Sequence, residues 1–268
     1  MAIMINGFTI TSLEQIHGYD RVDKSCALLL TELQNTTLNA TEETSDITGK
    51  GGRVLKQIKK NKGLTVNGAS ALISGDLLAA QTGSEQIVAD ADHKLKVRLV
   101  EVFTVTTGTT TVTTAEAAVG TTGAEIVDFR VMTANGGLTK DEFTQDTEAA
   151  ADKFAYNPAT KTLTLPTGLE DGTQVAVFYD FETANGSSVT DYSDVFGKTL
   201  YLIIDCLATD VCDNEYKCQF VIPRAQFSGE FSIEMGGDQT VHNFDIQTLV
   251  DTCAGTENGE LFTFIVYQ

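Results

Sequence analysis

Apolar and polar residues alternate with a period of two along much of the chain, which predicts strands rather than helices. The clearest alternation runs from Phe227 to Met235, where apolar residues or glycine occupy odd positions and serine or glutamate occupies even positions. This pattern is typical of an antiparallel strand with one buried face. Further strands are expected at residues 93–107, 126–131, 161–165, 173–181, 199–206, 216–222 and 261–267. The short apolar run at residues 26–33 leads to a loop and also favours a strand, with a helix as the alternative.

Three short segments carry helical signals. Residues 12–17 begin with Ser12 and have Gln15 three positions later, an arrangement that suits a capping box. Residues 69–81 follow an Asn-Gly turn and place their leucines and isoleucine roughly on one helical face, with Gly83 positioned to end the helix. Residues 147–154 are predicted to form a small acidic helix. We expect short helices that cover or flank strands.

The segment 41–62 has few apolar residues and contains the sequence Gly-Lys-Gly-Gly. A stretch of 13 residues in this segment contains six of the 18 cations of the chain, and a group of acids directly precedes it. The composition predicts a long extended loop, or arm, that projects from a compact domain. The glycine and lysine residues lack the GxxxxGK[ST] order of a phosphate-binding loop.

The arm has two main interpretations, a solvated charged loop and a surface of complementary charge between subunits. Charges at the rim of an interface set register and partner choice more than affinity. On the second interpretation the predicted interface residues are Thr44, Asp46, Lys50, Arg53, Lys56, Lys59 and Lys60.

With 268 residues, the chain is long enough for one large domain or two small ones. We expect a mainly β protein, a β-sandwich or barrel with a short flanking helix, a long extended loop and an inserted or appended β module. The predicted core consists of residues 1–100 and 186–268, with the arm at 41–62. Residues 101–185 are the β-rich inserted module, for which an immunoglobulin-like fold is one option.

The formal net charge of −19 argues against nucleic-acid binding over the whole surface, because such binding normally needs a basic face. An acidic wall past which DNA slides without sticking is compatible with this charge. The N-terminus has neither the basic start nor the apolar core of a signal peptide, and no run reaches the roughly 20 apolar residues of a membrane span. We therefore expect no membrane partner.

Side chains for catalysis or metal binding are sparse and scattered. His17, His93 and His242 have no metal-ligand spacing to one another, and the GxSxG, HExxH and dinucleotide-binding motifs are absent from the sequence. The five cysteines are expected to be reduced and mostly buried. A zinc site at Cys206, Cys212, Cys218 and His242 is a weaker alternative, because gaps of five residues match no usual structural site. We expect no enzyme activity and no cofactor.

Two stretches resemble the major tail, or tail tube, proteins of tailed bacteriophages. The first, residues 41–83, resembles their threonine- and acid-rich loop, Gly-Gly kink, strand and small apolar helix. The second is VIPRAQFSGEFSIEMGGDQTVHNFDIQTLVD at residues 221–251, which is similar to their paired strands with a Gly-Gly-Asp turn. Together these stretches cover about a quarter of the chain.

The resemblance implies a β-sandwich whose copies close into hexameric rings, with long loops that link stacked rings around a DNA conduit. It also implies a virion protein, made and assembled in the host cytoplasm, whose partners are itself and other tail or head proteins, with DNA only in transit. A capsid decoration or auxiliary head protein and an adhesion-type β module remain alternatives.

Overall fold

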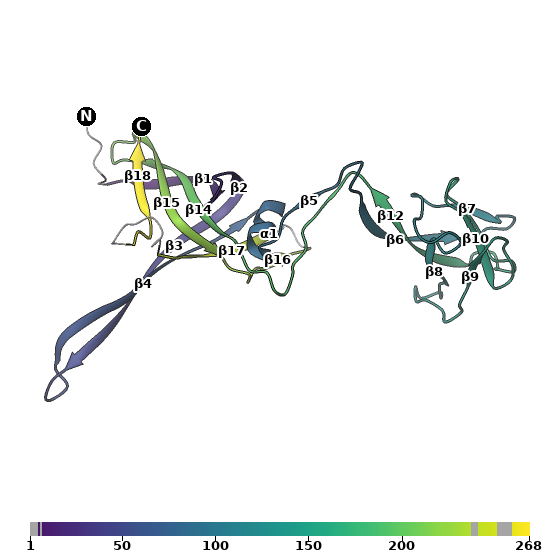
Figure 1. The fold of residues 1–268 in the computed structure, drawn as a ribbon, viewed down its shortest axis with the longest axis horizontal. Helices are drawn as coiled ribbons and strands as arrows, with labels where there is room; N and C mark the ends of the chain where they lie inside the picture. Colours follow the sequence, from purple (N-terminus) through teal and green to yellow (C-terminus); the bar gives the residue numbers. More distant parts are fainter. Residues whose placement is uncertain (1–4, 6, 237–240, 251–258) are drawn as a thin grey trace. The chain divides into compact units, whose positions relative to one another are not determined.

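The computed structural model describes residues 5, 7–236, 241–250 and 259–268. The chain folds as two compact units, each with its own core (Figure 1). Unit 1 combines the chain up to Ile87 with the chain from Ser188 onward, and unit 2 is Val88–Ser187. Strands dominate the described residues, which contain one helix. The predicted mainly β fold is confirmed.

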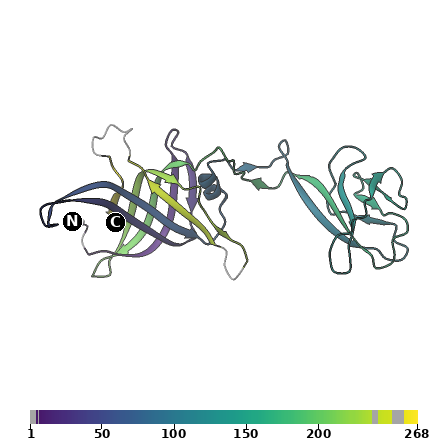
Figure 2. The same ribbon diagram turned by 90° about the horizontal axis from the view of Figure 1, so that it is seen from below.

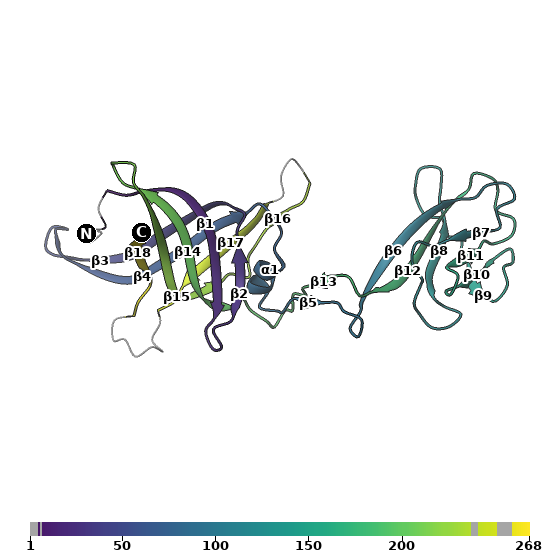
Figure 3. The ribbon, with the colours of Figure 1, turned by 90° about the horizontal axis from the view of Figure 1, so that it is seen from above.

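Unit 1 is built on one antiparallel sheet of nine strands, in the order β2-β1-β14-β15-β17-β4-β3, with β18 paired to β15 and β16 paired to β17. The sheet is strongly curved (Figures 2 and 3). Its strands are β1 (Thr9–Asp20), β2 (Cys26–Leu30), β3 (Leu33–Thr48), β4 (Val54–Ser70), β14 (Thr199–Thr209), β15 (Glu215–Phe227), β16 (Ile233–Glu234), β17 (Val241–Thr248) and β18 (Thr263–Tyr267).

One face of this sheet forms the core of unit 1. Along β14, Leu200, Leu202 and Ile204 are buried, whereas the residues between them are only half-buried. Because side chains alternate across a strand, this pattern assigns the aliphatic positions to the core and leaves Tyr201 and Asp205 on the other face. The strand predicted at 199–206 is confirmed, and it continues to Thr209.

The helix α1 (Gly75–Thr82) contributes to the same core through Leu77. The side chain of Ser74 caps the helix by accepting a hydrogen bond from the backbone N–H of Leu77 at 3.3 Å. Gly83, with φ of +76°, ends it in the left-handed conformation, as predicted. The predicted start at residue 69 is wrong, because β4 continues to Ser70 and pairs there with β3 and β17.

Unit 2 is a sandwich of two small sheets. The orders are β6-β12-β8 and β7-β11-β10-β9, and side chains from both sheets form one core. The strands are β6 (Leu95–Thr104), β7 (Thr111–Thr113), β8 (Ile126–Val131), β9 (Thr144–Asp146), β10 (Lys153–Asn157), β11 (Thr162–Thr164) and β12 (Gln174–Thr183). The chain enters and leaves unit 2 through two short paired strands, β5 (Ile87–Val88) and β13 (Ser187–Ser188).

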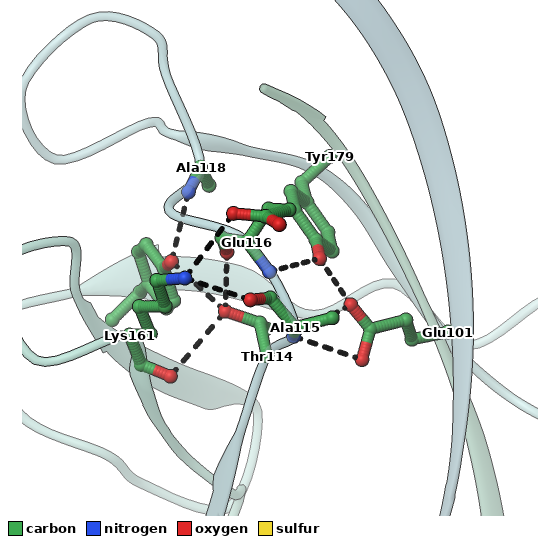
Figure 4. A network of polar contacts seen from close by, with 8 residues as sticks. Glu101, Thr114, Ala115, Glu116, Ala118, Lys161 and Tyr179 are labelled. Carbon is green, nitrogen blue, oxygen red and sulfur yellow. Dashed lines mark hydrogen bonds and ion pairs between the residues drawn. The ribbon is translucent and has the colours of Figure 1, made fainter. Parts of the chain in front are cut away.

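A polar network fixes the connection that follows β7 to the core of unit 2 (Figure 4). The buried Tyr179 donates its hydroxyl hydrogen to Glu101, which also accepts the backbone N–H of Ala115 at 2.9 Å. On the other side, Lys161 donates to the Ala115 carbonyl at 2.7 Å and pairs with Glu116 at 3.2 Å. The pKa of Tyr179 is raised to about 12, mainly because the hydroxyl is buried and secondly because it is hydrogen-bonded to Glu101. The hydroxyl therefore keeps its proton.

Several predicted elements are replaced by other pairings. Residues 12–17 are not a helix, because β1 pairs there with β14. The predicted helix at 147–154 is also wrong, since Phe154 is buried within β10 instead. The strand predicted from Phe227 to Met235 ends at Phe227, and only Ile233–Glu234 pairs again further on.

The Asn67-Gly68 turn is wrong as well, because both residues lie inside β4. A side chain at Gly68 would collide with the ring of Phe244, which lies opposite in β17. Glycine therefore serves close packing between strands here rather than a turn. Of the predicted Gly236-Gly237-Asp238 turn, the last two residues lie outside the described part of the chain.

Candidate assembly interface

The arm predicted as an extended loop is a β-hairpin. β3 and β4 pair in antiparallel register from Leu33 opposite Ser70 to Thr48 opposite Val54. The threonine, isoleucine and valine residues of the segment favour strands, and the glycines provide the reversal. The prediction of a loop is wrong in this respect, although the segment does extend away from the rest of unit 1 (Figure 1).

The glycine cluster forms the tip of the hairpin. The backbone N–H of Gly52 donates to the Gly49 carbonyl at 3.1 Å, and that of Gly49 donates to the Arg53 carbonyl at 2.8 Å. The first of these hydrogen bonds closes a turn over residues 49–52. Gly51 is its third residue and has φ of +82°, the value that a type II turn requires at this position. Gly52 follows with φ of +75°. Two consecutive positive φ angles explain why two glycines stand together.

The outer hairpin, residues 39–62, is exposed to solvent on both faces. Every residue from Asn39 to Lys62 is exposed, apart from Gly49, which is half-exposed. A two-stranded ribbon without a covering layer is marginally stable in water. The outer hairpin therefore gains little from its own chain, and it would gain most from contact with another molecule.

The predicted interface residues all lie on this outer hairpin, and all are exposed. Thr44 lies opposite Lys59, Asp46 opposite Gln57, Lys56 opposite Ile47 and Lys60 opposite Glu43, while Lys50 and Arg53 belong to the turn. Their place in an interface stays a prediction.

Only part of the positive charge of the hairpin is balanced locally. Lys59 pairs with Glu42 at 2.9 Å, but both side chains are exposed, and such pairs contribute about 0–1 kcal/mol. Among the described residues, the structure shows no ion pair for Lys50, Arg53, Lys56 or Lys60. Residues 41–62 contain three acids and six bases, so this segment carries +3 in a chain of −19, and the remainder carries −22.

Sequence reasoning missed four aliphatic residues near the hairpin tip. Ile47, Val54, Leu55 and Ile58 are 45%, 57%, 71% and 37% exposed. Ile47 and Ile58 lie on the same face, because Ile47 is opposite Lys56 and Ser45 is opposite Ile58. The available signal was the position of aliphatic residues on both sides of a glycine turn. Exposed aliphatics surrounded by cations are typical of a contact surface.

The three histidines do not form a common site. His17 contacts Asp205 at 3.0 Å on the face of the sheet away from the core, and His93 lies exposed beside Asp90 at 3.3 Å. His242 is fully buried in β17. Burial disfavours ionisation of Asp205, but the hydrogen bonds that it accepts outweigh this effect and hold its pKa below the usual value.

The cysteines are likewise dispersed. Cys206 and Cys218 are buried opposite each other on β14 and β15, whereas Cys26 and Cys212 are exposed, and all four are free. The prediction of mostly buried thiols therefore holds for half of them, and Cys253 lies outside the described residues. Within the described ranges, no three His, Cys, Asp or Glu side chains gather closely enough to hold a metal ion.

Acid is expected to destabilise unit 1 through His242. Its Nε2 lies 2.8 Å from the Gln81 side-chain oxygen, so Nε2 carries the hydrogen, and Nδ1 has no partner among the described residues. Burial lowers the pKa of His242, because protonation would add an unpaired N–H to the core. The unfolded chain gains this proton below a pH of about 6.5, and the folded chain gains it only at lower pH. The free energy of unfolding should therefore fall as the pH decreases below about 6.5.

Urea unfolding at pH 7.5 and pH 5.5 measures this effect, with His242→Gln as the matched control. A glutamine amide can also donate to Gln81, but it does not titrate. The loss of stability at pH 5.5 should be smaller in the variant than in the wild type. Equal losses in both proteins would contradict the assignment to His242.

The comparisons with known proteins point in one direction. The family model described as "YomU/Tube protein family" matches residues 8–264, which is nearly the whole chain. The search of curated proteins finds no match. In the part of the chain that the structure describes, no helix is long and apolar enough to cross a membrane.

Proposed function

The chain belongs to the YomU/Tube protein family, a phage tail tube family, and we propose that it is a tail tube subunit that assembles with copies of itself. Under this proposal, copies close into rings, the rings stack, and the channel through them carries DNA. The hexameric form of the ring rests on the resemblance of residues 41–83 and 221–251 to tail tube proteins. A structural family of this kind is not typically enzymatic.

The observation that carries the proposal is the bare outer hairpin. A segment of more than twenty residues, exposed on both faces, is ordered at the expense of conformational entropy without burying apolar side chains against its own chain. Contact with a neighbouring subunit offsets that expense. We assign the contact between successive rings to residues 41–62, with Thr44, Asp46, Lys50, Arg53, Lys56, Lys59 and Lys60 in the interface.

The distribution of charge supports the same arrangement. The hairpin segment is positive, and the remainder of each copy is strongly negative, so hairpin and neighbour attract each other. The acidic excess also suits a channel wall, because it repels the phosphate backbone and lets DNA slide past.

The ends of the sheet in unit 1 support ring closure. β2 and β3 are the terminal strands of the sheet, so each has one edge without a neighbour in the described topology. Open edges can pair between copies, and a closed ring leaves none free. We assign tube formation to unit 1 and regard unit 2 as a β module inserted into it.

Membership of a phage tube family places the protein in the virion, where other tail or head proteins are its further partners. Assembly in the host cytoplasm before incorporation into the virion belongs to the proposal.

Negative-stain imaging of the purified wild-type protein tests the proposal. A tube subunit at high concentration should form rings or tubes of uniform diameter. A capsid decoration protein should instead remain monomeric or trimeric, and that result would overturn the assignment to the tail tube.

A further inference from the structure

Unit 1 has an apolar recess of about 530 Å³ at the end of the sheet where β1 begins. Three of its residues, Ile5, Ile10 and Phe262, are 61%, 49% and 39% exposed. Apolar side chains line the recess, namely Ile5, Phe8, Ile10, Phe220, Phe262 and Phe264.

The recess is an open end of the core and not a separate pocket. Ile10 lies opposite Ala208 and Phe220 lies opposite Ile204, and both partners are buried on the core face of the sheet. The ring of Phe220 packs against that of Phe264, with 4.6 Å between their centres. Solvent-exposed aromatic surface that continues a core is a site where further apolar side chains gain by burial.

Acidic residues form the neighbouring turn between β14 and β15. Phe8 contacts Tyr216 edge to face, with 4.9 Å between the ring centres, and the Tyr216 hydroxyl donates to Asp210 at 3.3 Å. Asp213 follows in the same turn and is exposed, whereas Glu215, the first residue of β15, lies opposite Thr209 on the face away from the recess. Lys217 lies opposite Leu207, on the face of the sheet away from the recess. The rim of the recess on this side is therefore negative.

The hairpin tip has the opposite properties. It presents four exposed aliphatic side chains, Ile47, Val54, Leu55 and Ile58, among four cations that form no ion pair within the described residues. In its own chain the tip is exposed, so it does not occupy the recess of the same copy. Nucleic acid and anionic lipid are poor occupants, because the acidic turn repels phosphate groups.

We propose that the aliphatic hairpin tip of one copy inserts into the aromatic recess of a second copy, with the cations of the tip against the acidic β14–β15 turn. This inference rests on the proposed self-assembly and identifies the surface that receives the hairpin. Apolar contacts at the centre and opposite charges at the rim match the usual anatomy of protein interfaces.

The exposed Cys212 provides a reporter, because it lies in the acidic turn beside the recess. The test protein carries Leu55→Cys at the hairpin tip, with Cys26 and Cys253 replaced by serine. After assembly, a short bismaleimide should link Leu55→Cys of one copy to Cys212 of another and give a ladder of covalent oligomers on a denaturing gel. Adding Cys212→Ser should abolish the ladder. Moving the new cysteine to Val22, which is 92% exposed in the β1–β2 turn, should also abolish it.

A charge placed in the recess provides a second test. Ile10→Asp should leave a folded subunit, because Ile10 is half-exposed, but it should reduce tube formation at least tenfold. The matched control Val22→Asp should assemble as the wild type does. If wild-type tubes form while the ladder is missing and Ile10→Asp assembles normally, the recess is not the receiving surface, and the tube proposal stands. If the wild type forms no rings or tubes, the tube proposal fails, and this inference fails with it.

Discussion

A chain in which Asn-Gly replaces residues 45–58 is expected to remain folded and to form no tubes. Thr44 lies directly opposite Lys59, so a two-residue type I′ turn can join them and keep the register of the remaining strands. Apart from the half-exposed Gly49, the removed residues are exposed, and the core of unit 1 should keep its stability to within about 0.5 kcal/mol. Size-exclusion chromatography and electron microscopy measure assembly, and thermal unfolding separately measures whether the subunit remains folded.

Two full-length variants separate the contributions of the hairpin. Replacing Ile47 and Ile58 by threonine keeps the strand propensity and removes apolar contact area, so it should lower the amount of tube at equilibrium. Five cations of the hairpin form no ion pair within the described residues. Replacing four of them, Lys50, Arg53, Lys56 and Lys60, by serine should mainly slow assembly and weaken its dependence on salt. Long tubes from the shortened chain would show that the hairpin does not join the subunits.

Strands with local signals could be predicted from the sequence. Residues 126–131 and 199–206 combine β-branched or aromatic residues with alternation, and both form strands. The sharper alternation at residues 227–235 predicted a continuous strand that the structure does not contain. A regular pattern alone does not form a strand, because a strand also needs a neighbour in register. After Phe227 the strand β15 ends, and within this stretch only Ile233 and Glu234 form a strand again, paired with β17.

Helix signals were less reliable for a similar reason. The segment 147–154 contains three alanines and two acids, which favour a helix locally. Burial of Phe154 between the sheets of unit 2 is worth more than the propensity of a helix of two turns. At residues 75–82 the local helix signal and the tertiary packing favour the same structure, because Ser74 caps the helix and Leu77 enters the core.

The composition of the hairpin indicated an exposed segment but not its secondary structure. When both faces of a strand are exposed, apolar alternation no longer marks it, and a charged strand then resembles a loop. The recess was beyond prediction because it joins Phe8, Phe220 and Phe264 from three distant parts of the sequence. Only the pairing of β1, β14, β15 and β18 brings these residues to one face.

Phe129→Ala is expected to destabilise unit 2 by about 3–5 kcal/mol. Phe129 is fully buried, stacks on Phe154 with 5.0 Å between ring centres, and meets Phe143 edge to face at 5.3 Å. Truncation removes the aromatic contacts of both neighbours and leaves a cavity between the two sheets. Urea unfolding, followed by the fluorescence of tryptophan introduced at an exposed position of each unit, measures the two units separately.

Val127→Ala is the matched control, because Val127 lies in the same strand and is 49% exposed. It should cost less than about 1 kcal/mol. Each unit buries a core of its own, so the transition of unit 1 should not move in either variant. A parallel loss of stability in unit 1 would mean that the two cores unfold as one cooperative structure. A loss below about 1 kcal/mol in Phe129→Ala would instead contradict the placement of this ring at the centre of unit 2.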